Sequence, residues 1–436
     1  MQTDLWRQLQ SVATLLQAVR GGSSATAALG KLAPESRPGV QALSFTVLRF
    51  LGRAQALRQL LASKTPPPAA DALLCTALAL AWQDQGAPYE AFTLVNQTVE
   101  AAKRGASTQA QAGFINACLR RFLREREALV ASTQTQAQAL WNHPLWWIDR
   151  LRKDWPDCWQ DILAANNVAA PMTLRVNLRK TSVASFLQTL ATAGMPAWAA
   201  GQAGVILRQA QPVQALPGFA EGLFSVQDLA GQMAASSLLS GLSGSGRLRV
   251  LDACAAPGGK TAHLLEIADC ELTALDIDPL RCESIHQNLQ RLSLQARVLA
   301  ADAGAVHSWW DGQAFDAILL DAPCTASGIV RRHPDVRWLR RPSDIAQLSA
   351  IQARLLKALW PTLKPGGRLL YSTCSVFRAE GEDQVQTFLA NNTAAALLPS
   401  AGHLLPSLHS DQTAVPDNQH REHDGFYYAL LQKRLA

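Results

Sequence analysis

Alternation of apolar strand-like runs with helical segments is the feature that most constrains how the second half of this chain folds. Such runs recur after residue 247, with helical segments between the first five. Repeated strand–helix units predict an α/β domain with a doubly wound, mostly parallel sheet. Ligands bind beyond the carboxyl ends of the strands in such sheets, so chemistry is expected in the loops that follow them. The runs are Leu248–Ala253, Leu272–Ile277, Val298–Ala301, Ala317–Leu320, Arg368–Ser372 and Phe426–Leu431.

The residues before this region show two other patterns. Residues 1–130 carry apolar residues at steps of three and four, which predicts a series of helices. Residues 170–235 mix short strand-like runs with helical ones, which indicates a small α+β module. We therefore expect a helical domain over residues 1–133, a linker helix with the α+β module over 141–235, and the α/β domain over 236–436.

Composition narrows the class of protein. With 48% hydrophobic and 17% charged residues, the chain can bury a core and is not mainly disordered. Its longest apolar stretch, Ala72–Trp82, is shorter than the about 20 residues that a membrane helix needs. The first residues lack the pattern of a secretory signal. We expect a cytoplasmic protein without a membrane partner and, because no cysteines form a C-x-x-C pair, without a metal site.

Positive charge is concentrated in the first third of the chain. Residues 1–145 hold 14 lysines and arginines against 8 acidic residues, whereas the remainder is neutral. Most of these cations are arginines, which suit forked contacts with phosphate, and Arg120, Arg121, Arg124 and Arg126 share one predicted helix. A basic module beside a neutral one is typical of a nucleic-acid-binding appendage on an enzyme. A solvated basic surface is the alternative, and charge alone does not exclude it.

The loop after the first strand-like run, Asp252–Thr261 (DACAAPGGKT), has the character of a ligand-binding turn. Gly258 and Gly259 let the backbone approach a ligand closely, and the helix that follows offers free N–H groups. The spacing matches neither the dinucleotide fingerprint G-x-G-x-x-G nor the phosphate-binding motif G-x-x-x-x-G-K-[ST]. A purely structural turn between strand and helix is the alternative.

Polar residues also follow the later strand-like runs. Asp276 and Asp302 stand at the ends of the second and third runs, where a carboxylate can accept hydrogen bonds from ribose hydroxyls or an adenine amino group. The fourth run leads into Asp321–Cys324, and the fifth leads into a Ser-Thr-Cys sequence that contains Cys374. Any one of these residues could merely cap a helix, but together they converge on one edge of one sheet.

These motifs resemble the RNA cytosine-C5 methyltransferases of the Nol1/Nop2/Sun family. The resemblance rests on Asp252–Thr261, Leu320–Trp338 (LDAPCTASGIVRRHPDVRW) and Ser372–Val376 (STCSV). The pairing of a Pro-Cys loop with a Thr-Cys loop is highly specific to that family. It implies a Rossmann-like domain with S-adenosylmethionine as the methyl donor. The run Ser375–Glu382 departs from the Pro-Glu-Glu-Asn type common in relatives, without removing a catalytic side chain.

The resemblance also assigns residues to the donor. Asp276 would bind its ribose hydroxyls, Asp302 would face its adenine, and Asp321 would lie near both the donor and the target base. The methionine end and the nearby ribose would lie in the loop formed by Cys254, Ala255, Ala256, Pro257, Gly258, Gly259 and Lys260.

Two cysteines carry the expected chemistry. C5 of cytosine is a poor nucleophile, and a thiolate that adds to C6 makes C5 resemble an enamine carbon. The resemblance assigns the addition to Cys374 and the release of the enzyme to Cys324, whereas DNA C5 methyltransferases use the Pro-Cys residue as nucleophile. The residues alone do not choose between the two. Burial is expected for the cysteines outside the strand ends, namely Cys75, Cys118, Cys158, Cys270 and Cys282.

The helical region extends the resemblance. Residues 1–130, which include Phe114–Glu125 (FINACLRRFLRE), look like a NusB-type RNA-binding domain, as in bacterial small-subunit rRNA enzymes of the family. This implies 16S rRNA as the partner, no DNA partner, and a monomer. A non-catalytic assembly factor is a competing interpretation, against which the intact Cys324, Cys374 and Asp321 argue. A second competing interpretation is a relative that acts on tRNA or on DNA. The Thr-Cys loop disfavours DNA as the substrate, and the helical domain favours rRNA over tRNA.

Overall fold

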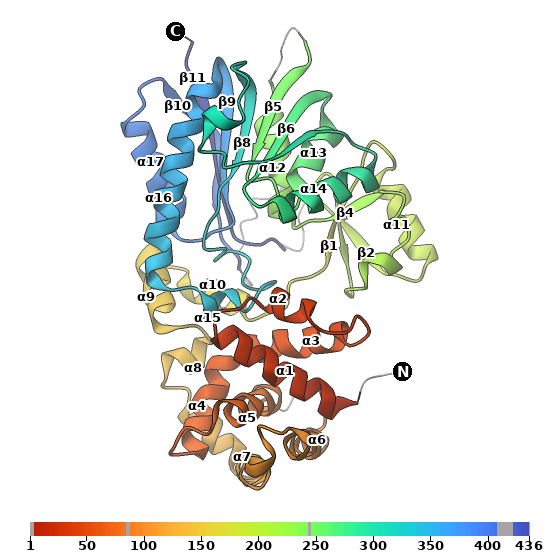
Figure 1. Ribbon diagram of the computed structural model, residues 1–436, viewed down its shortest axis with the longest axis vertical. Helices are drawn as coiled ribbons and strands as arrows, with labels where there is room; N and C mark the ends of the chain where they lie inside the picture. The colour runs from red at the N-terminus through yellow and green to blue at the C-terminus, as the bar shows by residue number, and fades with distance from the viewer. Residues whose placement is uncertain (1–3, 84–87, 243–245, 408–421, 436) are drawn as a thin grey trace. The chain divides into compact units, whose positions relative to one another are not determined.

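The described residues of the computed structural model form two compact units (Figure 1). The first unit comprises residues 1–169 and 330–342, and the second comprises residues 170–329 and 343–436. Within the described ranges, no helix is both long and apolar enough to cross a membrane. The three-part domain division expected from the sequence stays a prediction. The structure describes residues 4–83, 88–242, 246–407 and 422–435.

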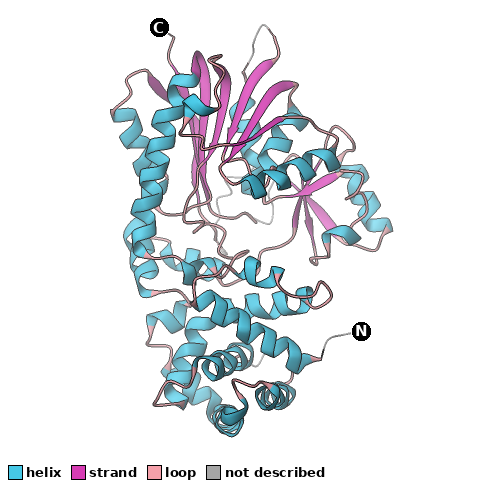
Figure 2. Cartoon of the chain, viewed as in Figure 1, coloured by secondary structure: helices cyan, strands magenta, loops and turns pink. Residues whose placement is uncertain are grey.

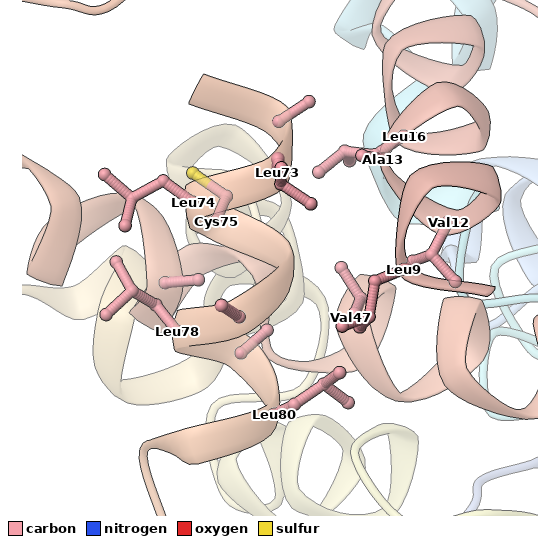
Figure 3. Close-up of a cluster of buried hydrophobic side chains, with 14 of the residues drawn as sticks. Leu9, Val12, Ala13, Leu16, Val47, Leu73, Leu74, Cys75, Leu78 and Leu80 are labelled. Atoms are coloured by element: carbon pink, nitrogen blue, oxygen red, sulfur yellow. The ribbon is translucent and has the colours of Figure 1, made fainter. Parts of the chain in front are cut away.

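The first unit consists of helices packed around one buried helix, α5 (Pro68–Ala81). Every α5 residue from Ala70 to Ala81 is buried, because the helix carries apolar or small side chains on almost all its faces. Leu73 of α5 and Leu16 of α1 belong to the same buried cluster (Figure 3). The other helices are α1 (Leu5–Arg20), α2 (Ala25–Gly30), α3 (Arg37–Arg49), α4 (Leu51–Leu61), α6 (Ala91–Arg104), α7 (Ala112–Ser132), α8 (Ala137–Trp141), α9 (Leu145–Asp154), α10 (Trp159–Asn166) and α15 (Val336–Leu339).

The boundary between α3 and α4 is not visible in the sequence. The periodic pattern over residues 38–63 predicts one helix, whereas the structure has two that meet at Phe50 (φ −110°, ψ 18°). Close packing constrains the chain just after the break. A Cβ on Gly52 would lie 2.3 Å from the carbonyl oxygen of Gln138 in α8, so only glycine lets α4 approach α8 this closely.

The first unit includes a segment that lies far along the chain, residues 330–342. Arg337 on this segment is fully buried and donates hydrogen bonds to the carbonyl oxygens of Asn142 (3.0 Å) and Asn166 (2.6 Å). The indole of Trp338 donates to the carbonyl oxygen of Leu48 at 2.7 Å. The polypeptide thus leaves the second unit after Ile329, completes the first unit, and rejoins the second at Ser343.

The second unit begins with a small antiparallel sheet of order β2-β3-β1-β4. Phe186 of the helix α11 and Phe224 of β4 pack in its core, with ring centroids 5.3 Å apart. The sequence predicts this α+β module but misses the strand β2, which pairs with β3. The elements are β1 (Thr173–Val176), α11 (Val183–Thr192), β2 (Ala197–Ala200), β3 (Gly204–Leu207) and β4 (Phe224–Val226).

The strands of the large sheet, which Figure 2 draws in magenta, have the order β10-β11-β9-β8-β5-β6-β7. Strands β7, β6, β5, β8 and β9 are parallel to their neighbours, which confirms the predicted doubly wound α/β fold. Apolar side chains of α12, α13 and α14 cover one face, and those of α16 and α17 cover the other. The elements are α12 (Leu229–Leu239), β5 (Leu248–Ala253), α13 (Gly259–Ile267), β6 (Cys270–Asp276), α14 (Pro279–Leu292), β7 (Arg297–Ala300), β8 (Phe315–Asp321), α16 (Pro342–Leu359), β9 (Leu363–Thr373), α17 (Glu382–Ala390), β10 (Ala395–Leu404) and β11 (Phe426–Lys433).

One strand of this sheet, β10, is absent from the sequence prediction. It is an edge strand that pairs antiparallel with β11 and contains Pro399 and Gly402, which are unfavourable inside a central strand. Its register with β11 shifts between Leu398 and Gly402. An irregular edge strand lacks the continuous apolar run that made the central strands visible.

A buried ion pair joins the small sheet to α13, a helix that covers the large sheet. Arg175 of β1 is 0% exposed as a side chain and Glu266 of α13 is 4% exposed, with 3.0 Å between Nη2 and Oε1. Arg175 also donates to the carbonyl oxygen of Gly259, the first residue of α13, at 3.0 Å. A buried pair of this kind is costly to break, because removing one partner leaves the other charge without compensation.

Replacing Glu266 alone is therefore expected to destabilise the second unit strongly. Glu266→Ala should lower the free energy of unfolding by about 3–5 kcal/mol, measured by urea denaturation of the full chain. The double change Arg175→Met with Glu266→Leu should recover much of this loss. Asp269→Ala, in the exposed pair with Arg247, should cost less than about 1 kcal/mol. Equal losses at Glu266 and Asp269 would contradict this explanation.

Candidate active site

Most of the predicted functional residues gather where four adjacent strands end, and Asp302 follows the next strand, β7 (Arg297–Ala300). Strands β9, β8, β5 and β6 are neighbours in the sheet and run parallel. Asp321 at the end of β8 is paired in register with Ser372 of β9, and Ala253 of β5 is paired with both Leu320 and Leu275. The loops that the sequence analysis selected therefore follow one common edge.

The loop after β5 is held against the end of β6. The N–H of Ala255 donates to the carbonyl oxygen of Leu275 at 2.7 Å, and the N–H of Ala256 donates to the carboxylate of Asp276 at 3.1 Å. Gly258 has φ +95°, and a Cβ there would lie 3.2 Å from the Cα of Ile285. The loop thus needs glycine at this position for both conformation and space.

The two acidic residues expected to hold adenosine have different surroundings. Asp276 is 2% exposed, accepts the N–H of Asp278 at 3.2 Å, and lies 3.4 Å from Arg281. Asp302 is more exposed and accepts two hydrogen bonds from Arg354, at 2.9 and 3.2 Å. Those bonds hold the pKa of Asp302 below its ordinary value. The sequence analysis missed Arg354, because nothing in its helical surroundings distinguishes it from a solvated arginine.

Lys260 and Asp321 form the charged centre of the site. The Lys260 ammonium lies 2.6 Å from one carboxylate oxygen of Asp321, and the hydroxyl of Ser372 donates to the other at 2.9 Å. Burial lowers the pKa of Lys260, but the charge and hydrogen bond of Asp321 outweigh it and raise the pKa above its ordinary value. The ammonium also lies 5.3 Å from the ring centroid of Phe426. Lys260 is thus a fixed cation, rather than a solvated lysine at the start of a helix.

A second carboxyl group, Asp252, lies beneath the same loop. It is fully buried at the end of β5 and accepts a hydrogen bond from Thr261 at 2.6 Å. Burial raises its pKa to about 7. Asp252 therefore fixes the start of α13 from inside and offers no surface to a ligand.

The two loop cysteines lie side by side. Their sulfur atoms are 3.3 Å apart, with Cys324 buried and Cys374 partly exposed. The hydrogen bond between the sulfurs and burial raise the pKa of Cys324 well above its ordinary value. Either sulfur can donate this S–H···S hydrogen bond.

The other cysteines mostly follow the expectation of burial. Cys75, Cys118, Cys270 and Cys282 are buried, whereas Cys158 is only partly buried. Cys254 in the donor loop has φ +64°, and burial raises the pKa of its thiol to about 12. A thiol with so high a pKa is protonated and unreactive at neutral pH.

Family models match two parts of this chain. Residues 242–432 match the family described as 16S rRNA methyltransferase RsmB/F, and residues 143–214 match the ferredoxin-like domain of RsmF/B-like methyltransferases. The crystal structure of PH0851 superposes with a TM-score of 0.75 at 23% identity, covering 99% of this chain and 100% of that one. A methyltransferase homologue from Pyrococcus horikoshii gives a TM-score of 0.54 at 28% identity, covering 68% and 97%.

Curated relatives share most of their length with this chain. Ribosomal RNA small subunit methyltransferase B of Pseudomonas syringae pv. tomato is 41% identical, over 95% of this chain and 93% of the relative. The protein of the same description from Vibrio cholerae is 39% identical, over 97% and 96%. Identity at this level over nearly complete chains shows that the protein belongs to the RsmB/F family of 16S rRNA methyltransferases.

Proposed function

We propose that this S-adenosylmethionine-dependent rRNA methyltransferase methylates C5 of one cytosine in 16S rRNA through a covalent adduct with Cys374. The observation that carries the proposal is the pair of sulfur atoms 3.3 Å apart at the strand ends. Two adjacent thiols suit a reaction in which one sulfur bonds to a pyrimidine and must later leave it. The Lys260–Asp321 pair at the same edge supplies fixed charge for the ring.

The residues at the ends of β5 and β6 fit the methyl donor. Gly258 has no side chain to cover the loop backbone. The Asp276 carboxylate lies within hydrogen-bond distance of the same loop, at the N–H of Ala256. Ile277 and Leu280, 67% and 82% exposed, add apolar surface beside Asp276 on which an adenine can lie. S-adenosylmethionine supplies a methyl group made electrophilic by its positively charged sulfur. We assign the ribose to Asp276 and the adenine side to Asp302.

The first step belongs to Cys374. Its thiolate forms a bond to C6 as the C5=C6 π bond opens, and the electron pair moves onto C5 and, through the ring, toward N3. Because an ionised carboxylate only accepts hydrogen bonds, we assign stabilisation of the negative charge at N3 to the Lys260 ammonium, and to Asp321 the hydrogen bond from the neighbouring amino group of cytosine. Asp321 also keeps the Lys260 ammonium in place.

The second step separates the enzyme from its product. After C5 has accepted the methyl group, the C5 proton passes to water, the C5=C6 bond re-forms, and the C6–S bond breaks with its electron pair returning to Cys374. A thiol with a raised pKa keeps its proton at neutral pH, so Cys324 can donate a hydrogen bond to the departing thiolate. Cys324 thus acts late and Cys374 acts early.

This division of roles predicts opposite results for two alanine variants. Cys374→Ala should abolish both methylation and the covalent RNA adduct, because the early nucleophile is missing. Cys324→Ala should still form the adduct but release it slowly, so that a protein–RNA complex accumulates on denaturing gels after incubation with a 16S rRNA transcript and S-adenosylmethionine. Cys158→Ala, outside the site, serves as control. Trapping by Cys374→Ala instead would reverse the assignment.

The donor assignment predicts a binding defect at Asp276. Asp276→Ala removes both the ribose acceptor and the hydrogen bond that holds Ala256, so calorimetry should show at least about tenfold weaker S-adenosylmethionine binding, or about 1.4 kcal/mol. Asp269→Ala, on the exposed turn before β6, is the matched control. Unchanged affinity in Asp276→Ala would refute the ribose role.

The helical region is proposed to hold the RNA through its phosphates. Arg120→Gln with Arg124→Gln, on α7, should weaken binding of a 16S rRNA transcript and flatten its salt dependence, because each lost phosphate contact reduces the slope by about 0.7–0.9. Binding measured from low to moderate salt gives both quantities. Arg247→Gln, an exposed arginine of the second unit, is the control. An unchanged slope would contradict a phosphate role for these arginines.

A further inference from the structure

A buried carboxylate outside the described chemistry links the two cysteine loops. Glu380, in the short helical turn Arg378–Glu380 that follows β9, is 0% exposed. One of its carboxylate oxygens accepts the N–H of Thr325 at 2.8 Å, and the other accepts the hydroxyl of Ser375 at 2.6 Å. Thr325 follows Cys324 directly, and Ser375 follows Cys374 directly. One carboxylate therefore holds the next residue after each cysteine.

Further hydrogen bonds make this connection rigid. The hydroxyl of Thr325 also donates to the Glu380 carboxylate. The side-chain amide of Gln352, in α16, donates to the same carboxylate at 3.3 Å and to the carbonyl oxygen of Pro323 at 2.9 Å. The backbone carbonyl of Glu380 accepts the hydroxyl of Tyr371 at 2.8 Å. Glu380 thus receives hydrogen bonds from both loops and from α16.

The same network continues between the loops. Ser327 and Ser375 are both fully buried, with hydroxyl oxygens 2.9 Å apart, and the Ser327 hydroxyl accepts the N–H of Val376 at 3.0 Å. The N–H of Gly328 donates to the carbonyl oxygen of Cys374 at 2.9 Å. The two loops are therefore bonded to each other around Glu380, on the buried side of the cysteines.

Burying a carboxylate is unfavourable unless hydrogen bonds compensate for the lost water. Burial raises the pKa of Glu380, and the hydrogen bonds from Ser375 and Thr325 oppose that rise. An apolar side chain would fill this space without such a cost but could not hold two loops by their donors. Because Glu380 has no exposed surface, it cannot touch RNA or the methyl donor directly.

We propose that Glu380 is a positioning residue that sets the distance between Cys324 and Cys374, and that this distance governs the release of methylated RNA. The inference rests on the proposed roles of the two cysteines. If the Glu380 carboxylate is lost, the loops separate, and Cys324 no longer reaches the sulfur that leaves C6. Addition by Cys374 needs only one sulfur and is affected less.

The test uses two measurements that do not depend on each other. The first is the rate at which diamide, a thiol oxidant, joins Cys324 to Cys374 in the free full-length protein, followed by mass spectrometry. The second is the fraction of a 16S rRNA transcript held covalently during turnover with S-adenosylmethionine, together with the KM for RNA. Only the second measurement depends on the proposed catalytic roles.

Glu380→Ala should slow disulfide formation and slow release by about 100-fold, the effect expected when reacting groups shift by about 1 Å. The covalent complex should accumulate, and the KM for RNA should fall together with kcat, because release then limits turnover. Glu380→Gln should be intermediate, since its amide oxygen can still accept from Thr325. Glu382→Gln, a partly exposed residue paired with Arg378, is the control and should behave like the unaltered protein.

Milder variants guard against failure of Glu380→Ala to fold. Thr325→Val and Ser375→Ala each remove one hydroxyl donor and should slow disulfide formation and release in the same direction by a smaller factor. Unchanged disulfide formation in the folded variants would overturn the positioning role. Slower disulfide formation without accumulation of the RNA complex would leave Glu380 as the link between the loops but overturn both its control of release and the assigned role of Cys324.

Discussion

The parallel pairing of β8 with β9 is the constraint on which the rest of the site depends. Its register places Asp321 beside Ser372, whose hydroxyl then binds the Asp321 carboxylate. Because side chains alternate between the two faces of a sheet, a shift of one residue would turn these side chains apart and separate the cysteine loops that follow. The apolar faces covered by α12–α14 and by α16–α17 fix that register. Packing of the core thus determines where the side chains of the candidate active site lie relative to one another.

Sequence reasoning located the strand ends because continuous apolar runs and the residues that follow them are local signals. The same reasoning missed β10, which contains Pro399 and Gly402 at a sheet edge. It also predicts one helix over residues 38–63, where the structure has two helices that meet at Phe50. Lys260 was assigned to the donor loop, but its ion pair with Asp321 joins residues 61 positions apart and has no local signature.

Glu380 illustrates what a motif comparison overlooks. The run after Cys374 departs from the usual family pattern, and the pattern alone assigns no contact to Glu380. The contacts of Glu380 within that run include residues far away in the sequence, such as Thr325 on a loop and Gln352 on a helix. Arg175 is comparable: its position in a short strand suggests a surface residue, yet it is fully buried against Glu266. A buried charge of this kind can be recognised only from the residues that pair with it, and the fold determines which residues those are.

The return of residues 330–342 to the first unit has a consequence for how the protein is made. A ribosome completes the helices before residue 169 first, but the bonds of Arg337 to Asn142 and Asn166 must wait until β5 through β8 have been synthesised. Until then the carbonyl groups that Arg337 binds lack this partner, so the first unit cannot reach its final state during early translation. Its completion is tied to the emergence of the Cys324 loop, and a chain truncated before residue 330 would leave the helical unit unfinished as well as the sheet.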